Sequence, residues 1–110
     1  MSAALAWLVV ALHLLFALAE SVGWDQMARR FGYSREATEH TRALALNQGA
    51  YNAGIAVVLG WALATGRTDA AIALLSFIAV MGVVGGASVR WTIPVVQTVP
   101  AVIAIALLLL

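Results

Sequence analysis

A cluster of polar side chains inside a long apolar run constrains how this chain can fold. The run extends from Ala43 to Ala64, and the segment 47–52, with the sequence NQGAYN, falls early in it. Inside hydrocarbon, a polar side chain costs free energy unless it finds a hydrogen-bond partner. The segment must therefore face other helices or a ligand, and the rest of the chain is expected to surround a polar chamber.

The composition is that of an integral membrane protein. Hydrophobic residues make up 64% of the 110 residues and charged residues 10%, against about 45–50% and about 25% in soluble domains. The chain has no cysteine, which excludes disulfides, thiolate metal sites and cysteine nucleophiles. Its sequence contains no P-loop and no metal-ligand cluster, so we expect neither a metal nor a cofactor. The net charge of +1 does not favour a nucleic-acid partner.

Four apolar runs are each long enough to cross a bilayer. About 20 helical residues cross ~30 Å of hydrocarbon, and the runs cover residues 3–23, 43–64, 69–88 and 93–110. We therefore predict a single all-α domain over residues 1–110, an integral membrane four-helix bundle. A secretory signal peptide is a weaker interpretation of the first run, because no positive residue precedes it.

The connections contain helix-capping residues. Asp25 is predicted to cap a brief helix over residues 26–31, which Gly32 would end. Ser34 is predicted to be the N-cap of a longer helix that continues to residue 64. Residues 65–68 are predicted to form a tight turn, with Asp69 at the start of the next helix.

The placement of arginine predicts how the spans are oriented. Five of the six arginines fall in the first and third connections, and one falls in the second. The five are Arg29, Arg30, Arg35, Arg42 and Arg90, and the sixth is Arg67. Because cytoplasmic loops carry an excess of basic residues, we expect the first and third connections to be cytoplasmic. Both termini are then expected outside the cytoplasm, with the chain in the cell (inner) membrane.

The polar residues of the spans also share helical faces. At about 100° per residue, His13, Glu20 and Trp24 fall on one stripe of the first helix. In the second span, His40, Leu44, Asn47 and Tyr51 share a stripe that is predicted to face inward, with Gln48 and Asn52 beside it. In the last span, Arg90 and Gln97 are two turns apart on one face.

These residues are the candidates for ligand binding or proton coupling. They are Glu20, His13, Asn47, Gln48, Tyr51, Asn52 and Gln97. All except His13 fall in the cytoplasmic half of the predicted bundle, which predicts a polar pocket in that layer. A histidine inside a span is a candidate proton relay or haem ligand, and the alternative is a core histidine hydrogen-bonded to a neighbour.

Glu20 is the candidate on which the functional interpretation depends. An acid inside a span is costly in lipid and by default indicates a functional site. The structural alternatives are an ion pair with Arg90 or Arg42, or a side chain that reaches the nearby interface. The amides of the second span could similarly serve as interhelical contacts, worth about 0.6 kcal/mol each.

Four residues are predicted to have structural roles. Gly82 and Gly86 form a small-xxx-small pair, which allows another helix backbone to approach closely. Trp24 lies near an end of the first span, where aromatic side chains anchor helices at the interface. Arg90 is a possible partner of Glu20.

The motif Asn-Gln-Gly-x-Tyr-Asn at 47–52 resembles one in small four-span membrane proteins of bacteria and fungi known only as a domain of unknown function. Three further features are similar to that family: the spacing of His13, Glu20 and Trp24, the segment 31–34 (FGYS), and Gln97-x-x-Pro100. The likeness extends over essentially the whole chain. It implies the four-span topology and assigns no reaction.

Three function classes fit these features. The first is a proton-coupled carrier or binder of a small polar or amphiphilic molecule, with Glu20 exchanging a proton for the substrate. A chain of this length could form such a carrier as a homo-oligomer. The second is a membrane-embedded enzyme, of isomerase or epoxide-opening type, that acts on a lipophilic substrate through Glu20 or His13. The third is a structural or assembly subunit. The expected partners are the lipid bilayer and a small-molecule ligand.

Overall fold

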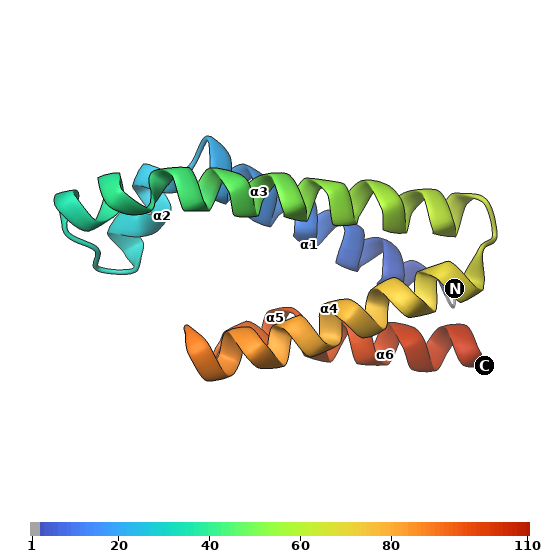
Figure 1. Ribbon diagram of the computed structural model, residues 1–110. Helices are drawn as coiled ribbons and strands as arrows, with labels where there is room; N and C mark the ends of the chain where they lie inside the picture. The colour runs from blue at the N-terminus through green and yellow to red at the C-terminus, as the bar shows by residue number, and fades with distance from the viewer. Residues whose placement is uncertain (1–2) are drawn as a thin grey trace. The chain divides into compact units, whose positions relative to one another are not determined.

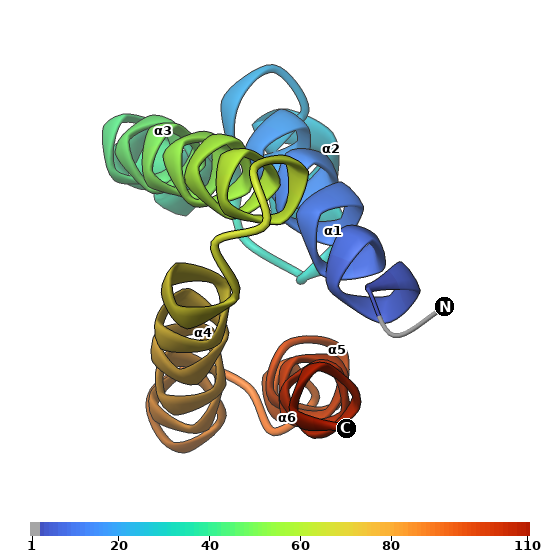
Figure 2. The same ribbon diagram turned by 90° about the vertical axis from the view of Figure 1, so that its right-hand side faces the viewer.

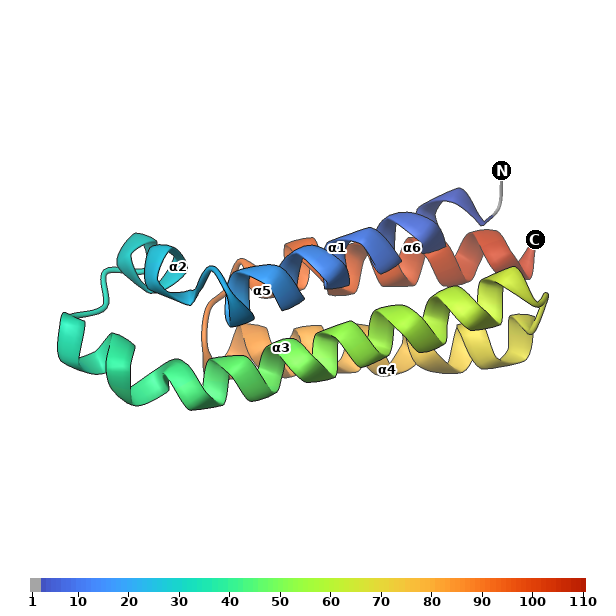
Figure 3. The same ribbon diagram turned by 90° about the horizontal axis from the view of Figure 1, so that it is seen from above.

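The computed structural model describes residues 3–110, and over that range the chain is helical with no strand (Figure 1). The helices are α1 (Ala4–Ser21), α2 (Trp24–Arg30), α3 (Arg35–Ala64), α4 (Thr68–Ser88), α5 (Ile93–Val96) and α6 (Thr98–Leu109). The predicted all-α class is therefore confirmed for these residues. Figure 3 shows the chain leaving α1 through a bend into α2 and then returning to begin α3.

The chain divides into two compact units, which are described separately. One unit is Ala11–Ala56, which holds most of α1, all of α2 and the first part of α3. The other combines the residues up to Val10 with Val57–Leu110, and therefore holds α4, α5 and α6.

Two helices of the described residues are long and apolar enough to cross a membrane. They are α1 (Ala4–Ser21) and α4 (Thr68–Ser88), and the segment Ile93–Leu109 is a shorter apolar stretch. α3 is longer, but its first turns are charged and it contains the polar segment 47–52. The number of spans stays a prediction.

The connections between the first helices follow the predicted caps in part. The Ser34 Oγ accepts a hydrogen bond from the Ala37 N–H at 3.0 Å, which confirms Ser34 as the N-cap of α3. Gly32 has a φ of 79° just after α2, a conformation that favours glycine at a helix end. The prediction for Asp25 is wrong, because Gly23 occupies the N-cap position and α2 begins one residue before Asp25. Asp25 instead lies in the first turn of α2.

The turn between α3 and α4 depends on Gly66. Its φ of 70° is in the left-handed region, which permits the tight reversal predicted for residues 65–68. Asp69 lies in the first turn of α4, where its carboxylate favours the positive end of the helix dipole. It also pairs with Arg67, with 3.3 Å between Arg67 Nε and Asp69 Oδ1.

The apolar run 93–110 forms two helices rather than one. The helix is interrupted at Gln97, whose φ and ψ are −118° and −55°, so that α5 ends at Val96 and α6 begins at Thr98. Pro100 supplies the physical reason. It has no N–H to donate to the Val96 carbonyl, and its ring crowds that carbonyl, which breaks or kinks a helix at this point.

Glycines on one face of α4 bring it close to α5 and α6 (Figure 2). A Cβ on Gly82 would lie 3.0 Å from the Thr98 nitrogen, and one on Gly86 would lie 2.7 Å from Pro94 Cδ. The space at Gly85 is similarly limited, because a Cβ added there would lie 2.8 Å from Ile93 Cγ2. The small-xxx-small pair at Gly82 and Gly86 thus lies where two helix backbones approach closely.

Two side-chain hydrogen bonds connect the residues at the helix interruption, Gln97 and Thr98, to the backbone of α4. The Gln97 Nε2 donates to the Ile78 carbonyl at 3.3 Å, and the Thr98 Oγ1 donates to the Ala79 carbonyl at 2.8 Å. These bonds satisfy polar side chains that would otherwise face an apolar layer.

Candidate functional site

The candidate site in the unit Ala11–Ala56 begins where α3 packs on α1. The contact is centred on Gly49, which is buried. A Cβ at Gly49 would lie 3.0 Å from the Ala17 carbonyl oxygen and 3.4 Å from Glu20 Cβ. Because Gly49 has no side chain, the two helices can approach at this point. The sequence reasoning missed this role, although the glycine stands in the middle of the NQGAYN segment.

The close approach places Asn52 beside Glu20. Asn52 is buried one turn after Gly49, and its Nδ2 donates a hydrogen bond to Glu20 Oε1 at 2.5 Å. Glu20 itself is half-buried. An amide donor satisfies a carboxylate oxygen but brings no positive charge, so the charge of Glu20 is not neutralised by this bond.

A groove of about 250 Å³ lies next to this pair. Its lining combines polar side chains with aromatic and aliphatic ones. The lining residues are Glu20, Trp24, Tyr33, Thr41, Leu44, Ala45 and Gln48. At this volume the groove is smaller than the ~300–1,000 Å³ of pockets for drug-sized ligands, so it suits a small molecule.

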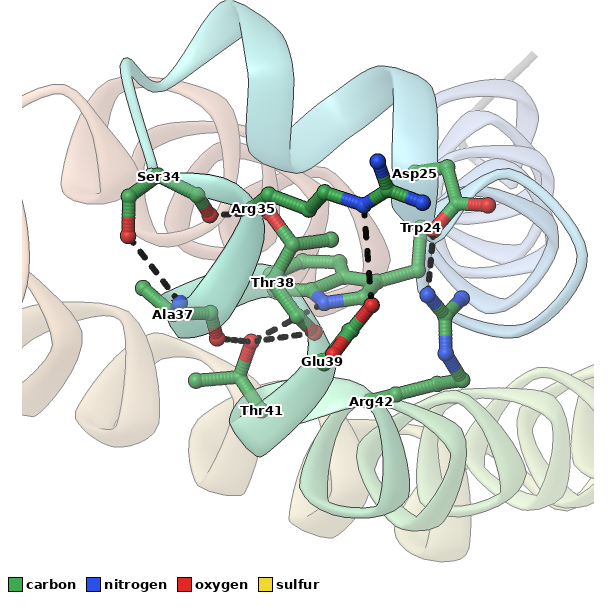
Figure 4. A network of polar contacts seen from close by, with 9 residues as sticks. All are labelled: Trp24, Asp25, Ser34, Arg35, Ala37, Thr38, Glu39, Thr41 and Arg42. Atoms are coloured by element: carbon green, nitrogen blue, oxygen red, sulfur yellow. Dashed lines mark hydrogen bonds and ion pairs between the residues drawn. The ribbon is translucent and has the colours of Figure 1, made fainter.

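The aromatic wall of the groove is held in place by hydrogen bonds (Figure 4). The Trp24 Nε1 donates to Thr41 Oγ1 at 3.0 Å, and Thr41 Oγ1 donates onward to the Ala37 carbonyl at 2.8 Å. The rings of Trp24 and Tyr33 meet edge to face, with centroids 6.0 Å apart. Trp24 is also buried against Ala28 and Ala45. Its indole therefore has a fixed orientation, which a ligand site requires.

Arg42, which follows the groove residue Thr41 in the chain, forms an ion pair. Arg42 Nη2 lies 2.6 Å from Asp25 Oδ1, and both side chains are labelled in Figure 4. The alternative in which Arg42 is the ion-pair partner of Glu20 is therefore wrong. Arg90 lies in the other unit, and its pairing with Glu20 stays a prediction.

The predicted inward stripe of α3 needs a correction. His40, Leu44, Asn47 and Tyr51 are all exposed, with exposures of 71% at Leu44 and 64% at Tyr51. The buried face instead contains Ala45, Gly49, Asn52 and Ala56. The physical reason is size, since helices approach through small residues and the larger polar side chains are left outside the contact. A ligand-binding role for Asn47 and Tyr51 stays a prediction.

The other candidates lie apart from the groove. His13 is almost fully buried in α1, and its ring meets Phe16 edge to face with centroids 5.3 Å apart. It does not line the groove. Gln97 belongs to the other unit, where it bonds α4. The structure thus brings together Glu20, Asn52, Gln48 and Trp24, and it adds Tyr33 and Thr41, whose polarity and place in the first connection were the available signals.

Comparison with known proteins identifies the family and no activity. Searches of the curated proteins and of the solved structures found no match. One family model matches residues 7–109, nearly the whole chain, and agrees with the resemblance to a domain of unknown function. The chain belongs to the family described as "Protein of unknown function (DUF1304)".

Proposed function

We propose that this protein is an integral membrane four-helix bundle that binds and carries a small amphiphilic molecule in the groove beside Glu20. The observation that carries the proposal is the half-buried carboxylate of Glu20, which lines a groove of polar and apolar side chains. This carboxylate accepts a hydrogen bond from the uncharged amide of Asn52. Such a carboxylate can hold a proton or a polar ligand group in turn.

Placement in a bilayer is supported by the apolar surface of the helices. α1 and α4 are each long and apolar enough to span a membrane. Many large apolar side chains of the described residues are exposed, among them Leu15, Leu18, Val57, Phe77, Val80 and Leu109. Large exposed apolar patches are rare on water-soluble monomers. Lipid chains are the partner that would cover it, and a second copy of the chain could cover part of it.

The lining of the groove supports an amphiphile rather than a purely polar ligand. Glu20, Thr41 and Gln48 offer polar atoms, whereas Leu44 and Ala45 offer aliphatic surface. A ligand with a polar head and a short apolar tail would satisfy both sets, because the polar groups fix its orientation while apolar contact supplies burial. In the carrier, Glu20 would release a proton when the ligand binds and regain it when the ligand leaves.

A cysteine-protection experiment tests the ligand site, since the natural chain contains no cysteine. Gln48→Cys places a thiol in the groove, and Ala50→Cys places one on an exposed face of α3 that does not line it. Each variant is reacted with a maleimide in the presence of hexyltrimethylammonium, hexyl sulfate or hexanol.

The proposal predicts that at least one of these amphiphiles slows labelling at Gln48→Cys saturably and leaves Ala50→Cys unchanged. Equal slowing at both positions would indicate a general effect on the membrane or micelle. That result, or no protection by any of the three probes, would overturn the proposed binding site.

A further inference from the structure

We infer that the ligand is an organic cation, an ammonium group attached to a short apolar chain. The inference rests on the proposed function, in which the groove binds an amphiphile, and it specifies the class of that amphiphile. Three properties of the groove carry it: its charge, its aromatic wall and its size.

The lining of the groove includes an acidic side chain and no basic one. Glu20 is the one acidic side chain among the lining residues, and no lysine, arginine or histidine lines it. Arg42, the basic residue that follows Thr41, is engaged 2.6 Å from Asp25. Asn52 contributes an amide hydrogen bond to Glu20 and no charge. A cationic ligand would therefore supply a counter-charge within the groove, whereas an anionic one would meet the carboxylate with like charge.

The aromatic wall favours the same sign of charge. Trp24 and Tyr33 both line the groove and contact each other edge to face. The hydrogen bond from Trp24 Nε1 to Thr41 points the polar edge of the indole at the hydroxyl. The π faces of Trp and Tyr attract ammonium groups, and Trp does so best. Anions gain nothing comparable from these faces.

The size of the groove limits the apolar part of the ligand. A volume of about 250 Å³ lies below the range typical of drug-sized pockets. The aliphatic side chains of Leu44 and Ala45 can cover a short alkyl chain. Hexyltrimethylammonium combines a permanent positive charge with such a chain, so it serves as the probe.

The test reads the emission of Trp24 directly. Replacing Trp7, Trp61 and Trp91 with Phe leaves Trp24 as the sole tryptophan of the four in the chain. The variant in detergent is titrated with hexyltrimethylammonium, hexanol and hexyl sulfate, which share the alkyl chain and differ in head-group charge. The inference predicts saturable binding of the cation, with a Kd about tenfold below that of hexanol, and no saturable binding of the sulfate.

Glu20→Gln then isolates the carboxylate, because it keeps an oxygen for the Asn52 amide while removing the charge. The cation should bind about tenfold more weakly to Glu20→Gln, and hexanol should bind equally to both proteins. Gln48→Glu should have the opposite effect on cation affinity to Glu20→Gln. It adds a second carboxylate to the groove and should strengthen cation binding.

The outcomes separate the two proposals. If cation, alcohol and sulfate bind equally, or if neither Glu20→Gln nor Gln48→Glu alters the affinity for the cation, the groove binds amphiphiles without preference for cations. The proposed function would then stand and the present inference would fall. If no probe binds saturably, both fail.

Discussion

Asn52 on α3 donates a hydrogen bond to Glu20 on α1, although the two residues are 32 positions apart in the chain. The bond forms one turn from Gly49, where the absence of a side chain lets α3 approach the backbone of α1. The same contact therefore positions the carboxylate, which lines the groove.

Asn52→Asp should weaken this contact. The substitution replaces the amide donor with an acceptor and places a second carboxylate against Glu20, at a cost of about 1–3 kcal/mol for the unsatisfied polar groups. Thermal unfolding in detergent measures the loss as a lower melting temperature. The exchanged pair, Glu20→Gln with Asn52→Asp, again has one amide and one carboxylate and should recover most of the stability. If the double variant loses as much as the two single variants combined, the hydrogen bond does not hold α1 and α3 together.

Gly49→Ala should be more harmful than Gly54→Ala, although both lie in α3. A Cβ at Gly49 would lie 3.0 Å from the Ala17 carbonyl oxygen, whereas a Cβ at Gly54 has no neighbour within 4 Å. Alanine favours a helix by about 0.5–1 kcal/mol over glycine, so Gly54→Ala should be neutral or stabilising. Overpacking typically costs about 1–3 kcal/mol, so Gly49→Ala should lower the melting temperature. Equal melting temperatures for the two variants would contradict the packing of α3 on α1.

Gly86→Ala should destabilise the contact of α4 with α5. The added Cβ would lie 2.7 Å from Pro94 Cδ, in a ring that cannot rotate away. The expected loss is about 1–3 kcal/mol, read from thermal unfolding. Pro94→Ala removes the two ring atoms that the Cβ meets, so the effect of Gly86→Ala should be smaller in the Pro94→Ala background. An undiminished effect in that background would show that Gly86 meets something other than Pro94.

The proposed topology predicts that Leu110 lies outside the cytoplasm. It rests on five arginines in the first and third connections against one in the second. A reporter that is active only in the cytoplasm should be inactive when fused after Leu110, and a reporter that is active only outside should work there. The opposite pair of signals would invert the orientation.

Local chemistry made two helix boundaries predictable, while the faces of the helices depended on packing. Ser34 and Gly32 act within a few residues of themselves, so the start of α3 and the end of α2 followed from the sequence. Asp25 had two potential partners, the N-terminus of α2 and Arg42, and only the fold decides between them. The polarity of Asn47 and Tyr51 suggested an inward stripe, but small residues determined the contact instead.

The candidate site was predictable in part for the same reason. Glu20 and Asn52 were identified from their cost in lipid, and the structure pairs them. Tyr33 and Thr41 join the groove because α2 turns the chain back onto the start of α3. No periodicity within one helix contains that information. The interruption at Gln97 follows from the backbone effect of Pro100, which the apolar character of 93–110 does not reveal.

Proton movement across a vesicle membrane tests most directly whether Glu20 exchanges a proton for a cationic amphiphile. Purified protein is reconstituted into vesicles that contain a pH-sensitive dye, and hexyltrimethylammonium, which carries no titratable proton, is added outside. Entry of the cation in exchange for a proton should make the interior of wild-type vesicles more alkaline, and Glu20→Gln vesicles should match protein-free ones. The same alkalinisation with Glu20→Gln, or none with the wild type, would contradict proton-coupled carriage at Glu20.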